Sequence, residues 1–274
     1  MHRCTMLGYT GARSDPCCTP RPVRHRLRAL ADSKGPIQGA MIMSNAKAVK
    51  PRPGRLLMGL PPDTRVVIAD VTWNDYARLV DAVAEGENCR VAYDGKDVEL
   101  MNVGPVHDSL SEILGLFVNL VAEELQIDLR GARSTTWRRR KLNRGIEADL
   151  SYFIDAAKVA AFDAALARRS GKIKDYPNPD LAAEVDISRP KIDRQGIYAA
   201  LQVSEVWRVF EERVSIEQLQ SDGKYVAAVS SRFLRVTPDD VERWVLREGA
   251  RGSVTWKRRL REWVRNELIP RTAL

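Results

Sequence analysis

The nine residues DLAAEVDIS (180–188) constrain the fold more than any other stretch of the chain. Two acids, Glu184 and Asp186, stand among the apolar residues of 181–187, a run that is typical of a strand inside a sheet. Side chains two residues apart point to the same face of a strand, so Glu184 and Asp186 share one face and Val185 and Ile187 the other. Two interpretations are open at this point. The strand is amphipathic with its acidic face in water, or the acids are a metal-binding pair inside a cleft.

A second strand, GIEADLSYF (145–153), carries Glu147 and Asp149 in the same spacing. Buried carboxylates are strongly disfavoured unless they are paired or bound to a metal ion. Oxygen ligands from separate strands are what Mg²⁺ requires, and a bound metal lowers the pKa of an attacking water while a nearby cation stabilises charge on a phosphate. Three basic residues follow Glu184 and Asp186 in the sequence: Arg189, Lys191 and Arg194. Together these residues are typical of a site that hydrolyses a phosphodiester.

The remaining patterns predict a mixed sheet with helices packed on it, of the α/β or α+β class. Apolar spacing and caps predict helices over 72–85, 107–125, 156–170, 193–201, 238–248 and 255–268. Residues 89–101 predict a hairpin around Asp94-Gly95, and strands are expected over 134–143, 145–155, 181–188, 204–220 and 224–230. No G-x-G-x-x-G or P-loop motif follows a strand, so nucleotide-binding folds are not favoured.

The net charge of +8 does not by itself indicate nucleic-acid binding. Residues 1–58 contain eleven Lys and Arg against two Asp, whereas the rest of the chain contains 33 basic and 34 acidic residues. We interpret 1–58 as a disordered basic tail and 60–274 as the globular domain. Two readings of the tail stay open: an arm that grips phosphates, or a misassigned start codon with the true start at Met41, Met43 or Met58.

Cysteine usage and hydropathy indicate a cytoplasmic protein. The four cysteines form neither a C-x-x-C pair nor a zinc-finger spacing, and a disulfide framework is not expected. No apolar run approaches the ~18–20 residues that a membrane span needs, and the N-terminus lacks the apolar core of a secretory signal. We therefore expect no membrane association.

The ordered part of the chain resembles the Uma-two group of endonuclease-like proteins, within the restriction-endonuclease-like PD-(D/E)XK superfamily. The resemblance runs from about residue 65 to the C-terminus and leaves the tail uncovered. It rests on VAYDGKDVELM, the helix beginning at His107, STTWRR, GIEADLSYFI, DLAAEVDIS, IDRQGIYAALQVSEVWRV and the W-x₆-W helix of Trp256 and Trp263. It implies a restriction-endonuclease-like mixed central sheet flanked by helices, and a DNA endonuclease that depends on Mg²⁺ or Mn²⁺.

The resemblance also implies roles for single residues. Asp149 falls on the first metal-binding aspartate and Glu184 on the second acid, with Asp186 where the superfamily normally has its lysine. The cation is then expected from the following helix, where the chain offers Arg194, with Lys191 as the alternative. An arginine does not readily lose a proton, so Arg194 would position water or neutralise phosphate rather than act as a base. Three further polar residues are expected near the site: His107, Glu112 and Glu147. For His107 the alternative is a helix-capping or surface histidine.

Other features have less specific readings. The run Trp137-Arg138-Arg139-Arg140-Lys141, with Arg138 and Arg139 as its main candidates, would contact phosphates in a groove or lie in a solvated basic loop. The Trp256, Leu260 and Trp263 stripe predicts core or homodimer packing rather than a base-stacking platform. The missing strand lysine keeps two other functions in view. One is a catalytically inactive DNA-binding relative, and the other is an interaction module that kept the fold but not the substrate.

Overall fold

The computed structural model describes residues 59–83 and 89–272. The tail assigned to residues 1–58 lies outside this part of the chain, so that expectation remains a prediction. Within the described residues, no helix has the length and apolar character needed to cross a membrane.

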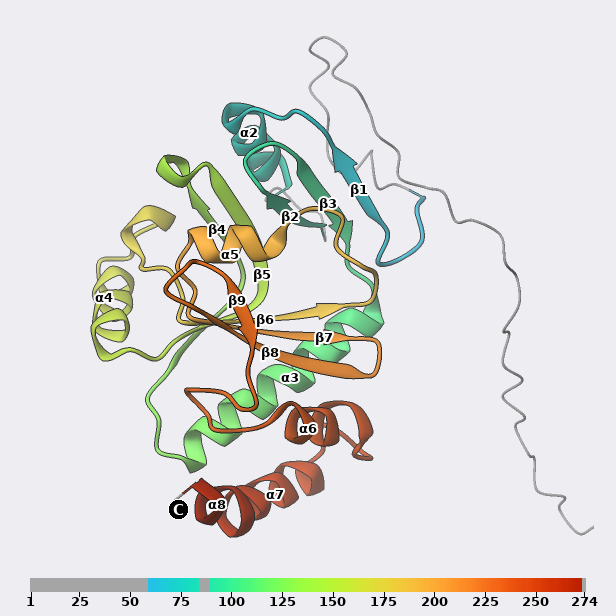
Figure 1. Ribbon diagram of the computed structural model, residues 1–274, viewed down its shortest axis with the longest axis vertical. Coiled ribbons are helices and arrows are strands. Elements are labelled where there is room, and N and C mark those ends of the chain that lie inside the picture. The colour runs from blue at the N-terminus through green and yellow to red at the C-terminus, as the bar shows by residue number, and fades with distance from the viewer. Residues whose placement is uncertain (1–58, 84–88, 273–274) are drawn as a thin grey trace, which may run out of the picture. The chain divides into compact units, whose positions relative to one another are not determined.

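A single mixed sheet organises the described chain (Figure 1). Its strands lie in the order β1-β3-β2-β5-β6-β7-β8-β9, and β4 pairs with the other edge of β5. Of the strand pairs in the described residues, β6 and β7 are parallel and the others are antiparallel. The bounds are β1 Arg65–Ile68, β2 Cys89–Tyr93, β3 Val98–Asn102, β4 Arg130–Arg139, β5 Arg144–Phe153, β6 Leu181–Asp186, β7 Glu205–Phe210, β8 Arg213–Leu219 and β9 Tyr225–Ala227.

Helices cover the sheet on both sides, as the sequence predicts (Figure 1). The helices are α2 Trp73–Val83, α3 Pro105–Glu124, α4 Ala156–Ala167, α5 Arg194–Ala200, α6 Pro238–Val241, α7 Val254–Trp263 and α8 Ile269–Thr272. Short helical segments complete the chain: η1 Arg140–Leu142, η2 Ile173–Asp175, η3 Glu242–Arg247 and η4 Val264–Leu268. The predicted class, a mixed α/β sheet flanked by helices, is confirmed.

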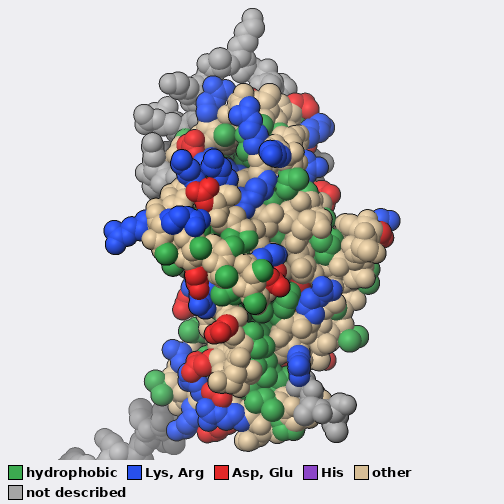
Figure 2. Space-filling view, turned by 90° about the vertical axis from the view of Figure 1, so that its left-hand side faces the viewer, with side chains coloured by type: hydrophobic (Ala, Val, Ile, Leu, Met, Phe, Trp, Pro, Cys, Tyr) green, Lys and Arg blue, Asp and Glu red, His purple; other side chains and the backbone are tan. Residues whose placement is uncertain are grey.

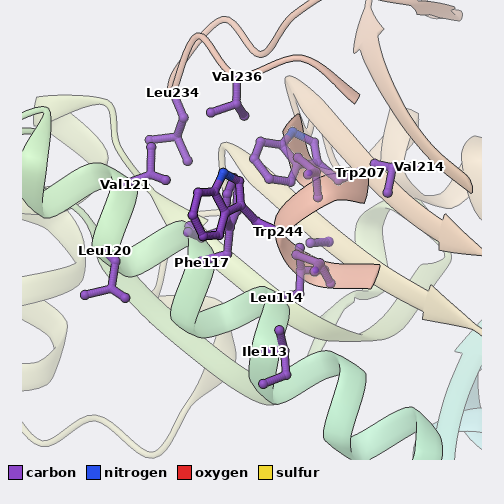
Figure 3. Packing of buried hydrophobic residues seen from close by; sticks show 14 of the residues in the cluster. Ile113, Leu114, Phe117, Leu120, Val121, Trp207, Val214, Leu234, Val236 and Trp244 are labelled. Carbon is purple, nitrogen blue, oxygen red and sulfur yellow. The ribbon is translucent and has the colours of Figure 1, made fainter. Parts of the chain in front are cut away.

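The long helix α3 forms the main core on one face of the sheet (Figure 3). Its apolar stripe, which includes Leu114, Phe117 and Val121, is fully buried and packs with Trp207 of β7 and Trp244 of η3. Burying such side chains stabilises the fold by about 1.5–3 kcal/mol each. Trp256 and Trp263 of α7 join the same core beside Trp244, which confirms their assignment to packing.

The opposite face of β5 and β6 is covered by α5. Ala182 of β6 packs there with Ile197 and Tyr198 of α5, whereas Ala183 and Val185 of the same strand belong to the α3 core. All six residues of β6 are buried because both faces of the strand are covered. The strand therefore places every second side chain, including Glu184 and Asp186, between the sheet and α5.

Two elements differ from expectation. The four-residue strand β1 was not predicted, because RVVI is too short to show a periodic pattern, yet it pairs with β3 along its whole length. The last strand, expected over 224–230, is limited to Tyr225–Ala227 because β9 pairs with only three residues of β8. The other predicted helices and strands are present, with ends shifted by a few residues.

Candidate active site

The candidate site lies where strand β5 changes its partner. Along one edge, β5 pairs first with β2, through Gly145 and Ile146, and then with β6, through residues 150–152. Asp149 lies in the gap between these two pairings. There its Oδ2 accepts a hydrogen bond of 2.9 Å from the backbone N–H of Val185. The carboxylate thus replaces a missing ladder bond and is held against β6, next to Glu184.

Two basic side chains hold Asp149 from the other directions. His107, in the first turn of α3, has its Nε2 3.1 Å from Asp149 Oδ2, and Arg90 of β2 donates from Nε to Oδ1 at 3.2 Å. Burial alone would raise the pKa of Asp149, but His107, the Val185 N–H and Arg90 outweigh it and hold this pKa at about 2. Asp149 raises the pKa of His107 above its usual value against the opposing effect of burial. Asp149 is therefore an ionised, fixed carboxylate at neutral pH.

Glu184 is held differently from Asp149. Its side chain accepts a hydrogen bond from the hydroxyl of Tyr198 on α5, and Nη1 of Arg194 lies 3.3 Å from its Oε2. Burial raises the pKa of Glu184 to about 7, with Asp149 and Asp186 adding to the rise and Arg194 opposing it. The two acids of the site therefore have opposite pKa shifts, a separation typical of acid and base assignments in active sites.

Glu184 and Asp186 do not lie in water. They are 1% and 2% exposed, so the interpretation of β6 as a strand with a solvated acidic face is wrong. Buried carboxylates need compensating charge, and arginines provide it here. Asp186 lies 2.5 Å from Nη2 of Arg65 and 3.6 Å from Nη1 of Arg194.

The raised pKa of Glu184 leads to a test of stability against pH. A carboxyl whose pKa is raised on folding destabilises the native state as pH rises from the unfolded pKa of about 4.5 to about 7. Glu184→Gln removes that cost. We expect it to raise the free energy of unfolding by about 3 kcal/mol at pH 8, and by little at pH 4.5, in urea unfolding. A variant that is less stable than wild type at pH 8 would contradict this assignment.

Two residues that the sequence analysis did not identify complete the network. Glu99 of β3 is buried and accepts hydrogen bonds from Nη1 of Arg65 at 2.7 Å, Nε of Arg194 at 3.1 Å and the backbone N–H of Lys191 at 2.5 Å. Arg65 of β1 also donates to the carbonyl and hydroxyl of Ser188, each at 3.0 Å. Glu99 has a sequence signal similar to that of Glu184, since it lies between the apolar residues Val98 and Leu100 and two residues from another acid, Asp97. Arg65 has no such signal.

The two candidate cations, Arg194 and Lys191, differ in burial and in their contacts with the acids. Arg194 is the first residue of α5, is 3% exposed, and contacts Glu99, Glu184 and Asp186. The three acids raise its pKa further, against the opposing effect of burial, so it stays charged. Lys191 approaches the network through its backbone N–H, and its side chain is exposed.

The other expected site residues lie at the margin of the network or outside it. Glu147 is bridged to Asp149 by Arg90, whose Nη1 lies 2.5 Å from Glu147 Oε1. Glu112 is exposed and pairs with Arg133 of β4. Arg138 and Arg139, which were expected to contact phosphates, make contacts within the protein. Arg138 pairs with Asp81 at 2.8 Å, and Arg139 donates to the carbonyls of Ile173 and Tyr176.

The donor set has the chemistry that a divalent cation needs, but its charge is at present balanced by guanidinium groups. Carboxylate oxygens of Asp149 and Glu184 are hard ligands of the kind that Mg²⁺ and Mn²⁺ prefer. Within the described ranges, no three His, Cys, Asp or Glu side chains are grouped in a way that could hold a metal ion. A metal ion at Asp149 would therefore have to displace Arg90 or share the carboxylate with it.

Part of the chain is similar to known proteins. Residues 73–246 match the family model Uma2, described as "Putative restriction endonuclease". One solved structure similar to the chain is a crystal structure from Anabaena variabilis described as "a putative nuclease belonging to DUF820", with 16% identity and a TM-score of 0.42. That match covers 64% of this chain and 99% of the other. Among curated proteins, no match to the chain is found.

Proposed function

The chain belongs to the Uma2 family, and from this premise we propose that it is a metal-dependent endonuclease that hydrolyses phosphodiester bonds of DNA. In this proposal Asp149 and Glu184 hold Mg²⁺ or Mn²⁺, Asp186 would join them as a ligand once Arg65 moves away from it, and Arg194 is the cation beside them. The family supports a nuclease of the hydrolase type. The metal, the DNA substrate and the residue roles are our proposal.

One observation carries the proposal. Asp149 and Glu184 lie side by side at the gap in the sheet, and Arg194 reaches Glu184 from α5. Two carboxylates from adjacent strands, with a cation beside Glu184, supply what phosphodiester hydrolysis requires, which is a place for a metal ion and a positive charge for the phosphate. Asp186 replaces the strand lysine, and Arg194 restores the positive charge at the same acids from a different element.

Each residue has a definite role in this scheme. When bound, the divalent ion would lower the pKa of the attacking water. Arg194 keeps its charge and stabilises negative charge on the phosphate, but it cannot accept a proton. Glu184, with its pKa of about 7, can exchange a proton near neutral pH. His107 fixes the orientation of Asp149 and is a positioning residue.

Access to Asp149 leads past Arg90. The side chains of Arg90 and Glu147 are each 11% exposed, whereas that of Asp149 behind them is 2% exposed. A metal ion that approaches Asp149 from this side would therefore meet Arg90 first. Arg90 then acts as a competitor of the metal for Asp149.

Arg90→Ala tests this competition. Removing one charge-assisted hydrogen bond of about 1.5 kcal/mol from Asp149 should tighten Mn²⁺ binding about tenfold in titration calorimetry, because the ion no longer displaces a guanidinium. Arg78→Ala, which removes an exposed arginine paired with Asp75 on α2, is the matched control and should leave Mn²⁺ affinity unchanged. Weaker Mn²⁺ binding by Arg90→Ala would show that Arg90 supports the site instead.

The proposed activity is tested by nicking of supercoiled plasmid and cleavage of single-stranded DNA with Mn²⁺, for wild type and Glu184→Ala. We expect cleavage by wild type and none by the variant. Cleavage that persists in Glu184→Ala would remove Glu184 from the site. Equal cleavage in Mn²⁺ and in EDTA would contradict metal dependence.

A second function remains in view because arginines neutralise the acids of the network. Arg65, Arg90 and Arg194 occupy the positions from which a metal ion would contact Asp186, Asp149 and Glu184. Such an arrangement also suits a catalytically inactive member of the family that binds DNA. Wild-type protein that binds duplex DNA but neither binds Mn²⁺ nor cleaves would favour this function.

A further inference from the structure

We propose that a basic surface at the tip of the β4–β5 hairpin binds the phosphate backbone of duplex DNA and directs the duplex toward Asp149. We define the basic surface as Arg140, Lys141, Arg144, Lys172 and Lys174. The inference rests on the proposed function for its substrate, but its contacts do not depend on metal binding or on cleavage.

Some basic residues at the hairpin tip make contacts within the protein, and others are exposed to solvent. Arg138 and Arg139 are engaged with Asp81 and with the carbonyls of Ile173 and Tyr176, as described above. Arg140 and Lys141, in η1, are exposed. Arg144, at the start of β5, donates from Nη1 to the neighbouring carbonyl of Asn143. Of the basic run 138–141, Arg140 and Lys141 are therefore the residues whose side chains are free to contact phosphates.

Arg139 brings a distant segment to the same place. Its two hydrogen bonds, of 3.1 Å to the Ile173 carbonyl and 2.8 Å to the Tyr176 carbonyl, fasten η2 to the end of β4. Lys172 and Lys174, on either side of Ile173, are exposed. Cations about 30 residues apart in the sequence thus become neighbours on one face, which the sequence pattern did not indicate.

The five side chains of the basic surface have no acidic partner within the described chain. In the two segments, 138–144 and 172–176, the one acid is Asp175, and it accepts a hydrogen bond from Ser170. Figure 2 shows Lys and Arg side chains gathered over the upper part of the face that carries α4 and the hairpin tip. In a domain with nearly equal numbers of acids and bases, such segregation creates a local positive potential that attracts polyanions.

The basic surface lies at a suitable distance from the acids. Arg144 and Asp149 belong to the same strand and are five residues apart, which corresponds to about 17 Å at a rise of about 3.3 Å per residue. Phosphates of one strand of B-DNA follow each other every 3.4 Å along the helix axis, so this distance spans about five phosphates. Arg90 and Glu147, the outer layer of the site, lie between the two positions.

The composition of the surface favours a duplex over a single strand. Proteins that bind single-stranded DNA stack its bases on exposed aromatic rings. Here Trp137 is 1% exposed, and Tyr176 is half-buried with its hydroxyl donating to the Ser170 carbonyl. Long basic side chains without such rings bind phosphates in a sequence-independent way.

The test is the affinity of the full chain for a 20-base-pair duplex in EDTA, measured by fluorescence anisotropy from 50 to 200 mM salt. Two double variants remove charge from the surface: Arg140→Gln with Lys141→Gln, and Lys172→Gln with Lys174→Gln. The matched control is Lys257→Gln with Arg258→Gln on α7, at the opposite end of the molecule (Figure 1). It removes the same charge.

Each double variant should lower the slope of log K against log salt by about 1.8, because each phosphate contact contributes about 0.9. Wild-type affinity should accordingly fall about 12-fold more than that of either variant between 50 and 200 mM salt. The control should keep the wild-type slope. Surface variants that match wild type, a control that weakens binding equally, or tighter binding of a single strand of the same length would each overturn the inference. Wild-type protein that binds the duplex in this way but does not cleave DNA with Mn²⁺ would instead count against the proposed function alone.

Discussion

Replacing Arg194 with alanine should abolish cleavage and lower the free energy of unfolding by about 3–5 kcal/mol, the usual cost of leaving buried charges without their partner. Arg194 is the common partner of Glu99, Glu184 and Asp186, whose side chains are at most 2% exposed. Without Arg194, the three carboxylates would repel one another in a region that excludes water. The loss of stability would be measured by urea unfolding and the loss of cleavage by plasmid nicking.

Arg194→Lys separates the two effects. A lysine restores the charge but not the planar guanidinium that contacts three acids at once, so we expect it to recover about half of the lost stability. Cleavage returns if the phosphate needs only a point charge and stays absent if it needs two parallel hydrogen bonds. Full cleavage by a folded Arg194→Ala would contradict the role of Arg194. Loss of cleavage in Lys191→Ala would then pass the role to Lys191.

Asp149→Asn should abolish Mn²⁺ binding and lower cleavage about a thousandfold or more, since a metal ion supplies several kcal/mol of transition-state stabilisation. It should also destabilise the fold. The pKa of Asp149 falls on folding from its usual 3.8 to about 2, so its contribution is present above pH 4 and is lost as pH falls toward 2. We expect a loss of about 2 kcal/mol at pH 7 and little change near pH 2 in urea unfolding.

The two carboxylates should thus differ in their effects on stability while agreeing in their effects on activity. Asp149→Asn costs stability because His107, Arg90 and the Val185 N–H favour the ionised acid. Glu184→Gln gains stability because its surroundings disfavour the ionised acid. Both variants should lose cleavage. If both lose stability equally, the difference in environment that the structure assigns to the two acids is wrong.

The sequence was sufficient for the two strands that carry the central acids. The alternation of acidic and apolar residues in 180–188 and 145–153 placed Glu184 and Asp149 on strands, and the apolar run around Glu184 indicated an inner strand. These local patterns persist in the fold because β6 is covered on both faces. The prediction that Asp149 and Glu184 belong to one site came from the family resemblance.

The partners of the acids could not be predicted from local patterns, because they come from distant parts of the chain. Arg65 and Asp186 are separated by 121 positions, and Arg194 and Glu99 by 95. In the sheet order β2 and β5 stand between β3 and β6, so these contacts depend on the arrangement of the whole sheet rather than on any local pattern. The same holds for Arg139, whose role is set by the position of η2.

The helix α5 explains why Arg194 rather than Lys191 reaches the acids. Asp193 caps the helix by accepting from the Gly196 N–H, so the helix starts at Arg194. The first turn of the helix packs against β5 and β6, and Arg194 is buried there, whereas Lys191 precedes the cap in an exposed loop. The sequence offered both cations, and the start of the helix distinguishes them.

Calorimetric titration of Mn²⁺ into the full chain tests the central claim most directly, with plasmid nicking measured on the same samples. Three proteins suffice: wild type, Asp149→Asn, and Glu262→Gln, which removes an exposed carboxylate on α7. Wild type and Glu262→Gln should bind Mn²⁺ and nick plasmid, and Asp149→Asn should do neither. Wild-type protein that binds no Mn²⁺, or Asp149→Asn that binds it with wild-type affinity, would contradict the proposed metal site.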